Sequence, residues 1–200
     1  MKKLKKLVIA AGLILSMSAF TLNMKSEAAA TGTIHKVQAG ETYWKLAKEM
    51  GIPVNSLEAT NHWKSLYAGE DIVVPYGQFT AAQKDLLARL VHAEAVGEPY
   101  AGKVAVASVV LNRIKSSQFP NSLDGVIYQI SNGHYAFTPV QNGQINQPAD
   151  WASKRAVNEA IAMEGQGKGS LFYYNPATTT NSWILSRTVV ARIGHHVFAK

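Results

Sequence analysis

Glu94 is the residue of this sequence best placed for acid–base chemistry. It follows Leu87, Leu90 and Val91 by seven, four and three residues, so an apolar helical stripe would run directly into its carboxylate. A carboxylate on a core-facing stripe is desolvated, which favours the neutral form and raises the pKa. A protonated carboxyl group is what general-acid cleavage of a glycosidic bond requires. A salt-bridged Glu at a helix end would show the same spacing, and spacing alone leaves both interpretations open.

Other catalytic patterns are missing from the sequence. His92-Ala93-Glu94 matches the H-x-E of zinc deaminases, but those enzymes also need a P-C-x-x-C pair, and this sequence has no cysteine. H-E-x-x-H, G-x-S-x-G and phosphate-loop motifs are also absent. His195-His196 lacks a nearby carboxylate cluster, so we predict a structural or substrate-contact role for it. We expect no metal and no cofactor.

The elements that would position Glu94 belong to a predicted domain over residues 80–200. Thr80 is a plausible cap for a helix over 81–95, and Gly97-Glu98-Pro99 breaks that helix. A longer and more apolar helix is predicted over 100–115. The later predictions are a short helix at 123–130, a loop or hairpin at 132–147, a helix from 150 to about 163, a flexible connection at 165–169, a strand at 171–174 and a hairpin partner for it at 189–198.

A smaller unit precedes this domain, over residues 33–75. The pattern predicts a strand at 33–38, helices at 43–50 and 54–61, and a strand at 71–75. Thr42 is a plausible N-cap of the first helix, and Gly51 is a stop signal. So small a unit buries little surface and is usually a binding module. The linker 76–79 is short, so we expect the two domains to lie close together.

The residues of this unit follow a specific pattern: Val37, Gly40-Glu41-Thr42, Trp44, Leu46, Ala47, Leu57, Asn61, Leu66, Gly69 and Val74-Pro75. This pattern resembles the LysM domain. The resemblance implies a βααβ fold that binds N-acetylglucosamine-containing glycans at residues 40–43 and 61–67. The implied glycan-binding residues are Gly40, Thr42, Asn61, Trp63 and Tyr67. Trp44 is better explained as a core aromatic, whereas Trp63 and Tyr67 fit either role.

Several segments of the second domain form a combined pattern: VHAEAVGEPYAGKVAVASVVLNRI, Ala136-Phe137-Thr138 with Asn142-Gly143, LFYYNP, Trp183-Ile184 and IGHHVF. Together they resemble the SleB/CwlJ cell-wall hydrolases of spore-forming bacteria, a family related to lysozyme-like transglycosylases. The family's catalytic Glu matches Glu94. Ala93 stands where that family usually shows Gly, and Val96 where it often shows Arg, which bears on substrate preference.

The resemblance implies cleavage of the bond from N-acetylmuramic acid to N-acetylglucosamine in peptidoglycan. In a lytic transglycosylase one Glu acts first as acid and then as base toward the 6-hydroxyl of the sugar, whereas a hydrolase normally needs a second carboxylate. The candidates for that second group are Glu98, Asp124, Asp150, Glu159 and Glu164. Asp150 is typical of an N-cap and Asp124 of a turn, and Glu159 and Glu164 are predicted to be exposed. No partner stands out, which favours the transglycosylase route.

Aromatic and amide side chains of the second domain are candidates for a sugar-binding cleft, because sugar rings pack on aromatic rings. The selected substrate-binding candidates are Tyr135, Asn142, Tyr174, Asn175 and Trp183. Phe137 and Phe172 are expected to be core residues, and Tyr173 is a further candidate.

The first thirty residues have the pattern of a secretory signal peptide, with four lysines before an apolar run at 7–20 and a small-residue site at Ala28-Ala29-Ala30. The apolar run is shorter than the roughly 20 residues of a membrane span, although a retained anchor stays open. This segment holds five of the lysines, so the net charge of +7 overstates the mature chain. A modest positive excess does not indicate nucleic acid, but it suits an anionic wall polymer.

The sequence thus predicts a secreted, two-domain α+β protein: a LysM module and a mainly helical, lysozyme-like, SleB-type domain with short strands. We expect cleavage of peptidoglycan strands at the cell wall, in the spore cortex or coat among other places. No stable membrane insertion is expected after signal cleavage, and accessory sporulation or germination proteins are candidate partners. The alternatives are an amidase or glucosaminidase, and a non-catalytic wall-binding protein.

Overall fold

The computed structural model describes residues 32–164 and 169–200. The predicted signal peptide lies outside the described residues, as does most of the predicted connection at 165–169. Among the described residues, no helix combines the length and the apolar character that crossing a membrane requires.

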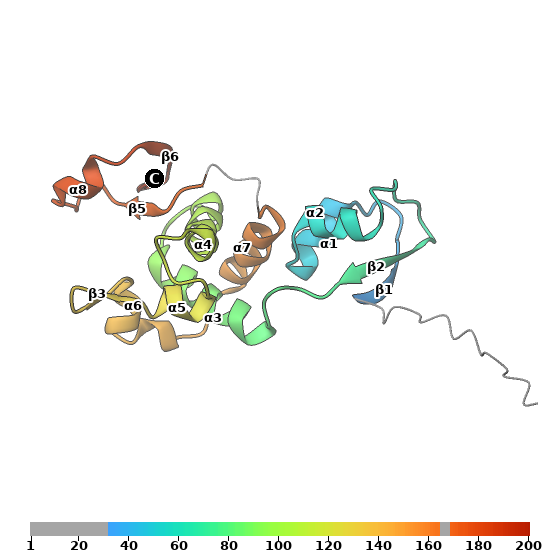
Figure 1. Cartoon of the computed structure of the whole chain (residues 1–200), viewed down its shortest axis with the longest axis horizontal. Helices are drawn as coiled ribbons and strands as arrows, with labels where there is room; N and C mark the ends of the chain where they lie inside the picture. Colours follow the sequence, from blue (N-terminus) through green and yellow to red (C-terminus); the bar gives the residue numbers. More distant parts are fainter. Residues whose placement is uncertain (1–31, 165–168) are drawn as a thin grey trace, which may run out of the picture. The chain divides into compact units, whose positions relative to one another are not determined.

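The N-terminal module, residues 32–75, has the predicted order of strand, helix, helix and strand (Figure 1). Its elements are β1 (Gly32–Lys36), α1 (Tyr43–Met50), α2 (Val54–Thr60) and β2 (Asp71–Pro75). The strands pair antiparallel, with Ile34 opposite Val73. The Thr42 hydroxyl caps α1 by accepting from the Lys45 amide at 3.1 Å, and Gly51 ends α1 in the left-handed conformation at φ 64°.

The C-terminal module, residues 80–200, is mainly helical, with short strands. Its helices are α3 (Ala81–Glu94), α4 (Tyr100–Lys115), α5 (Leu123–Ile127), α6 (Thr138–Gln141), the 3-10 turn η1 (Gln144–Asn146), α7 (Trp151–Ala162) and α8 (Ser182–Leu185). Its strands are β3 (Ile130–Ser131), β4 (His134–Tyr135), β5 (Phe172–Tyr174), β6 (Val189–Ile193) and β7 (His196–Ala199).

Helix α4 lies at the centre of the core of the C-terminal module. It contacts α3, α5 and α7, and its residues Val106, Ala107 and Val110 are fully buried. Burial on several sides explains why the α4 sequence is apolar around most of its circumference. Helix α3 begins at a capping box, in which Thr80 and Gln83 bond reciprocally, and its last residue is Glu94.

The last three strands form an antiparallel sheet in the order β5-β7-β6. The predicted pairing of the segment 189–198 with the strand at 171–174 is confirmed only for β7, which lies in the middle. The predicted hairpin is wrong in its partners, because β6 and β7 form the hairpin with each other. A second, two-stranded hairpin joins β3 to β4 through Asn132 and Gly133, whose φ angles of 51° and 79° are those of a tight two-residue turn.

Some predicted boundaries differ from the structure. The first strand covers Gly32–Lys36 rather than 33–38, and α2 ends at Thr60. The helix predicted over 123–130 ends at Ile127, because the chain turns there into the β3–β4 hairpin. The segment predicted as loop or hairpin at 132–147 also holds α6 and η1.

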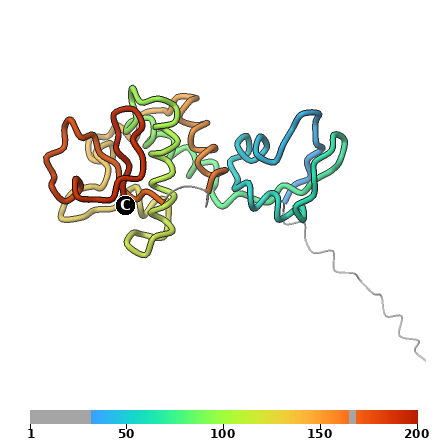
Figure 2. The backbone as a smooth tube through the Cα atoms, turned by 90° about the horizontal axis from the view of Figure 1, so that it is seen from above, coloured from blue at the N-terminus to red at the C-terminus, as the bar shows by residue number. Residues whose placement is uncertain are grey.

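Helix α7 packs against α1, as the short linker predicts (Figures 1 and 2). Ala162 of α7 is fully buried in the core of the N-terminal module. Two side chains of the C-terminal module donate to carbonyls at the end of α1: Lys84 Nζ to Met50 at 2.9 Å and Asn158 Nδ2 to Glu49 at 3.0 Å.

Candidate active site

Glu94 ends α3 in a half-buried position beside β5. The Tyr173 hydroxyl donates to Glu94 Oε2 at 2.9 Å. Burial raises the pKa of Glu94, while the hydrogen bond from Tyr173 and the charge of Arg113 oppose that rise without cancelling it. The predicted desolvation of this carboxylate is therefore present, and its protonated form persists to higher pH than that of an ordinary Glu.

Arg113 on α4 is the cation whose charge opposes the rise that burial causes in the pKa of both Glu94 and Tyr173. Its side chain is nearly buried, and Nε donates to the Leu171 carbonyl at 2.8 Å. Its guanidinium also lies over three aromatic rings, at 4.8 Å from Phe119, 5.1 Å from Phe137 and 5.8 Å from Phe172. Arg113 thereby ties α4 to the segment that leads into β5, and so helps to fix the position of Tyr173.

Strand β7 also packs against the Tyr173 ring. The rings of His196 and Phe198 lie with their centroids 5.2 Å and 6.0 Å from that of Tyr173. Burial lowers the pKa of His196, which favours the neutral imidazole. Burial and the carboxylate of Glu94 raise the pKa of Tyr173 well above its ordinary value, so its hydroxyl remains a donor.

His195 binds the carboxylate of Glu98. Its backbone N–H donates to Glu98 Oε2 at 3.1 Å, and its Nδ1 lies 3.0 Å from Oε1. The Glu98 side chain is only 5% exposed, so this contact holds the β6–β7 turn against the segment that connects α3 to α4. The described residues contain no group of three His, Cys, Asp or Glu side chains able to hold a metal.

The other carboxylates are bound at separate places. Asp150 caps α7 by accepting from the Ser153 amide at 2.7 Å, as predicted. The sequence predicts Asp124 in a loop turn, but it lies at the start of helix α5, where its carboxylate accepts a hydrogen bond from the Gln83 side chain at 3.3 Å. The prediction that Glu159 and Glu164 are exposed is wrong. The Glu164 side chain is 8% exposed and pairs with Lys115 at 2.8 Å, and Glu159 accepts from the Tyr100 hydroxyl at 3.0 Å.

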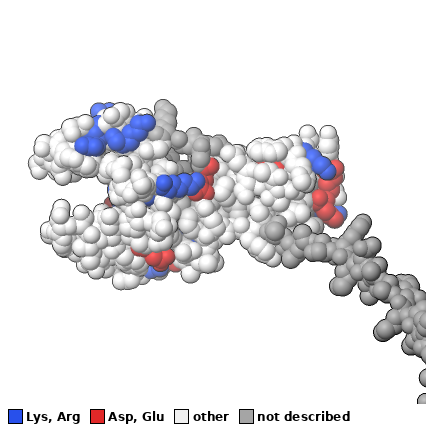
Figure 3. Space-filling view, viewed as in Figure 1, with Lys and Arg blue, Asp and Glu red and all other residues white. Residues whose placement is uncertain are grey.

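The predicted sugar-contacting residues fall into two groups. Tyr174 ends β5, Asn175 follows it, and Trp183 lies in α8. The Trp183 ring packs edge-on against Phe172, with ring centroids 5.1 Å apart. Tyr135 and Asn142 lie on β4 and after α6. Figure 3 shows a notch between the lobe with β5, α8 and β6 and the lobe with β3, β4 and α6. Helix α3 reaches both sides, because it contacts α6 and carries Glu94 to Tyr173.

Several predicted binding residues also have structural contacts. The side-chain oxygens of Asn142 and Asn175 accept from backbone amides two residues on, at 3.0 Å and 2.9 Å, and so build their own turns. Phe137 is buried as expected, whereas Phe172 is only half-buried.

In the N-terminal module, the predicted glycan-binding residues divide in the same way. The Asn61 side chain makes three hydrogen bonds of 2.8–2.9 Å to the backbone of Leu57 and Val73, and so joins α2 to β2. Gly40 adopts φ 80° in the turn before α1, and Thr42 caps α1. Trp63 and Tyr67 are each 65% exposed, whereas Trp44 packs against the core.

Sequence reasoning missed Arg113 and assigned Tyr173 to sugar contact. The signal for Arg113 was present, because it is a cation within the largely apolar α4, and such a charge needs a buried partner. The contact between Tyr173 and Glu94 joins residues 79 positions apart, which no local pattern encodes.

Comparison with known proteins identifies both modules. Residues 97–199 match the family described as Cell Wall Hydrolase, and residues 35–75 match the LysM domain. Glu94 lies three residues before the first of these ranges.

Similar curated proteins are named spore cortex-lytic enzymes. The one from Bacillus cereus is 34% identical over 203 residues, which cover 85% of this chain and 77% of that protein. The one from Halalkalibacterium halodurans is 45% identical over 113 residues, 56% of this chain. This chain spans only 33% and 39% of the relatives from H. halodurans and Bacillus subtilis.

A solved structure is also similar: the catalytic domain of the germination-specific lytic transglycosylase SleB from Bacillus anthracis. It aligns with a TM-score of 0.57 and 40% identity, and the alignment covers 64% of this chain and all of that one. The chain therefore belongs to the cell wall hydrolase family, and a LysM domain precedes the matching region.

Proposed function

We propose that this protein is a secreted enzyme that cleaves the glycan strands of peptidoglycan, with Glu94 as its general acid and base. The observation that carries the proposal is the environment of Glu94, which is half-buried, has a raised pKa and is held by Tyr173 at 2.9 Å. Family membership and the names of the similar proteins support the same substrate.

The mechanism follows from this environment. Protonated Glu94 donates its proton to the oxygen that links N-acetylmuramic acid to N-acetylglucosamine, and the bond from that oxygen to C1 breaks. The carboxylate formed on Glu94 is stabilised by the hydrogen bond from Tyr173 and by the charge of Arg113. It then removes the proton of the 6-hydroxyl, whose oxygen bonds to C1 and closes a 1,6-anhydro ring. Glu94 is protonated again at the end, and no water is consumed.

The transglycosylase route is favoured over hydrolysis by the positions of the other carboxylates. A hydrolase needs a second carboxylate facing the scissile bond. Glu98, Asp150 and Glu164 are instead bound to His195, Ser153 and Lys115.

Glu94→Gln tests the assignment. Gln keeps the size of the side chain and can still accept from Tyr173, but it cannot give and retake a proton. General acid–base groups contribute about 100- to 10,000-fold in rate, so the rate at which the variant clears a purified wall suspension should fall at least about 100-fold. Glu159→Gln is the matched control and should retain most activity. Near-normal clearing by a folded Glu94→Gln variant would refute the catalytic role.

The products distinguish the candidate reactions. Mass spectrometry should find anhydro-muramic ends, lighter by one water than hydrolysed ends. Reducing muramic ends would keep Glu94 but require a second carboxylate, and released stem peptides would instead indicate an amidase.

We further propose that the LysM domain binds wall glycan through its exposed aromatic side chains. His62 and Trp63 have positive φ angles of 56° and 57°, which are costly for residues with a side chain and are often kept at ligand-binding loops. That strained loop presents Trp63 to solvent. In the catalytic module, the proposed sugar contacts are Tyr135 on β4, Tyr174 on β5 and Trp183 on α8. These elements belong to the two lobes beside the notch in Figure 3.

Export and location complete the proposal. The names of the relatives favour spore cortex peptidoglycan as the substrate. Accessory sporulation or germination proteins are proposed as partners on the family resemblance alone. The signal pattern of residues 1–30 predicts a mature N-terminus at or near Thr31. N-terminal sequencing of wall-associated protein checks this, and an intact Met1 would contradict it.

A further inference from the structure

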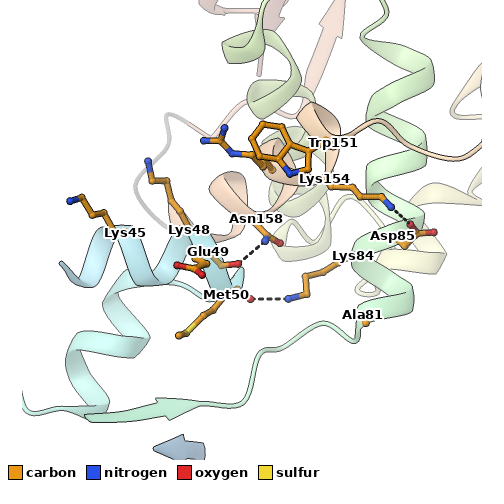
Figure 4. Close-up of a pocket in the computed structure, with 11 residues that line it drawn as sticks. Lys45, Lys48, Glu49, Met50, Ala81, Lys84, Asp85, Trp151, Lys154 and Asn158 are labelled. Carbon is orange, nitrogen blue, oxygen red and sulfur yellow. Dashed lines mark hydrogen bonds and ion pairs between the residues drawn. The ribbon is translucent and has the colours of Figure 1, made fainter. Parts of the chain in front are cut away.

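A groove of about 760 Å³ lies between α1 and the helices α3 and α7, and it contains neither Glu94 nor the exposed LysM aromatics (Figure 4). Lys45 and Lys48 line it from α1, Lys84 from α3, and Lys154 and Arg155 from α7. Two carboxylates, Glu49 and Asp85, line it as well. The mechanism proposed above gives this groove no role.

Hydrogen bonds between the modules set the shape of the groove. The last carbonyls of a helix lack partners within the helix, and here Lys84 and Asn158 supply donors to Met50 and Glu49 of α1 (Figure 4). Gly51 permits this close approach, because a Cβ atom there would overlap the Asn158 side chain. The groove is therefore built into the contact between the modules.

The charge of the groove is positive, with five cations against two carboxylates. Asp85 pairs with Arg89 at 3.1 Å and with Lys154 at 3.7 Å, and Lys48 lies 3.9 Å from Glu159. Lys45, Lys84 and Arg155 are then the groove cations without an ion pair among the described residues. Lys45 and Arg155 are exposed. An anionic ligand would therefore find cations on both walls, on α1 and on α7.

An aromatic surface accompanies these charges. Trp151 is 70% exposed, and the Arg155 guanidinium lies 4.5 Å from its ring centroid. A stacked guanidinium keeps its N–H edge available for bidentate bonds to a carboxylate. The exposed part of the indole provides an apolar plane for a sugar ring.

We propose that this groove binds the carboxylates of peptidoglycan stem peptides, with Arg155 and Lys45 as the main contacts and Trp151 against the attached sugar. The assignment rests on the proposed function, which makes the peptide-bearing strand the substrate. Carboxylates combined with a sugar ring fit an Arg–Trp stack, whereas a phosphodiester polymer needs only the lysines. The groove would hold an uncleaved strand by its peptides, so it selects peptide-bearing glycan over bare glycan.

The test measures binding separately from cleavage. The mature protein carrying Glu94→Gln is titrated with soluble glycan strands that retain their stem peptides, and with the same strands after an amidase has removed them. The groove variants are Lys45→Gln with Arg155→Gln, and Trp151→Ala. Arg192→Gln, which removes an exposed cation from β6, is the matched control.

We expect peptide-bearing strands to bind about tenfold more tightly than stripped strands, a difference of roughly 1.4 kcal/mol. The double variant should lose this difference, Trp151→Ala should weaken binding to both strands, and Arg192→Gln should preserve the parent's behaviour. Added salt should reduce the preference, because exposed charges are screened.

Equal binding of the two strands, or a preference that survives in the double variant, would overturn the proposal. Tighter, groove-dependent binding of poly(glycerol phosphate) would assign the groove to a phosphodiester polymer instead. Because all titrations use the Glu94→Gln background, absence of wall cleavage by the wild type would count against the proposed function and leave this result intact.

Discussion

The protonation of Glu94 depends on opposing effects of individual residues. Burial favours the neutral acid, which must donate the proton, whereas Tyr173 and Arg113 favour the carboxylate, which must accept one later. Glu94 has to donate a proton and later accept one, so its acid and carboxylate forms should be similar in free energy. If either form were much more stable, the step that consumes that form would become slow.

Tyr173→Phe tests this balance through pH. Cleavage requires protonated Glu94, so activity declines as pH rises through its pKa. The Tyr173 hydrogen bond lowers that pKa, and its loss should therefore raise it and move the alkaline limb of kcat/KM to higher pH, with a lower maximal rate. Tyr174→Phe, one residue on, should leave the limb in place. An unchanged or lower limb in Tyr173→Phe would show that the bond does not control the proton.

Among the elements, the turn between β6 and β7 is bound to the segment that connects α3 to α4. Gly194 in this turn has φ 56°, and a Cβ there would overlap Glu98 Oε2 and lie 2.7 Å from Pro99 Cδ. Gly133 also has a positive φ, 79°, but a Cβ there would meet nothing within 4 Å. Substitutions at the two glycines therefore share the cost of a left-handed backbone, and only the one at Gly194 adds a steric overlap.

Gly194→Ala should be clearly more destabilising than Gly133→Ala. Both substitutions carry the left-handed backbone penalty, of order 1–3 kcal/mol, but only Gly194→Ala also displaces the nearly buried Glu98 carboxylate. Urea denaturation should show the larger fall in midpoint for Gly194→Ala at a similar m-value. Equal midpoints would mean that the contact between Glu98 and the turn is not specific.

For the whole molecule, the contact between the modules affects how wall binding is tested. Deleting the LysM domain would uncover Ala162 and Asn158, so a deletion mixes lost binding with lost stability. Substituting exposed side chains outside that contact tests wall binding without loss of stability.

Trp63→Ala with Tyr67→Ala should reduce sedimentation with insoluble peptidoglycan and leave cleavage of soluble fragments unchanged. Linking two binding sites raises avidity over a single site by about 10²–10⁴, so the expected loss of apparent affinity is within that range. Tyr76→Ala, which removes a 72% exposed aromatic from the linker, is the control and should sediment like the parent. Unaltered sedimentation of the double variant would exclude these aromatics as the wall contact.

Much of the local structure could be predicted because its causes are local. The bounds of α1 follow from Thr42 and Gly51, and those of α3 from the Thr80–Gln83 box and the Gly97 break. Caps and turns are hydrogen bonds between residues a few positions apart, so the sequence shows both partners. The apolar stripe that reaches Glu94 is visible for the same reason.

The sequence by itself thus determined the order of the longer elements, the LysM and cell-wall hydrolase resemblances, and Glu94 as the candidate acid, whereas the short helices α6, η1 and α8 were not predicted. Only the tertiary structure decided that Tyr173 donates to Glu94, that Glu98 binds His195, and that a cationic groove lies between the modules. The physical reason is separation along the chain: these partners lie 79 and 97 positions apart, and their distances depend on how α3, α4 and the β5-β7-β6 sheet pack. Periodicity places a side chain on a face, but packing decides what that face meets.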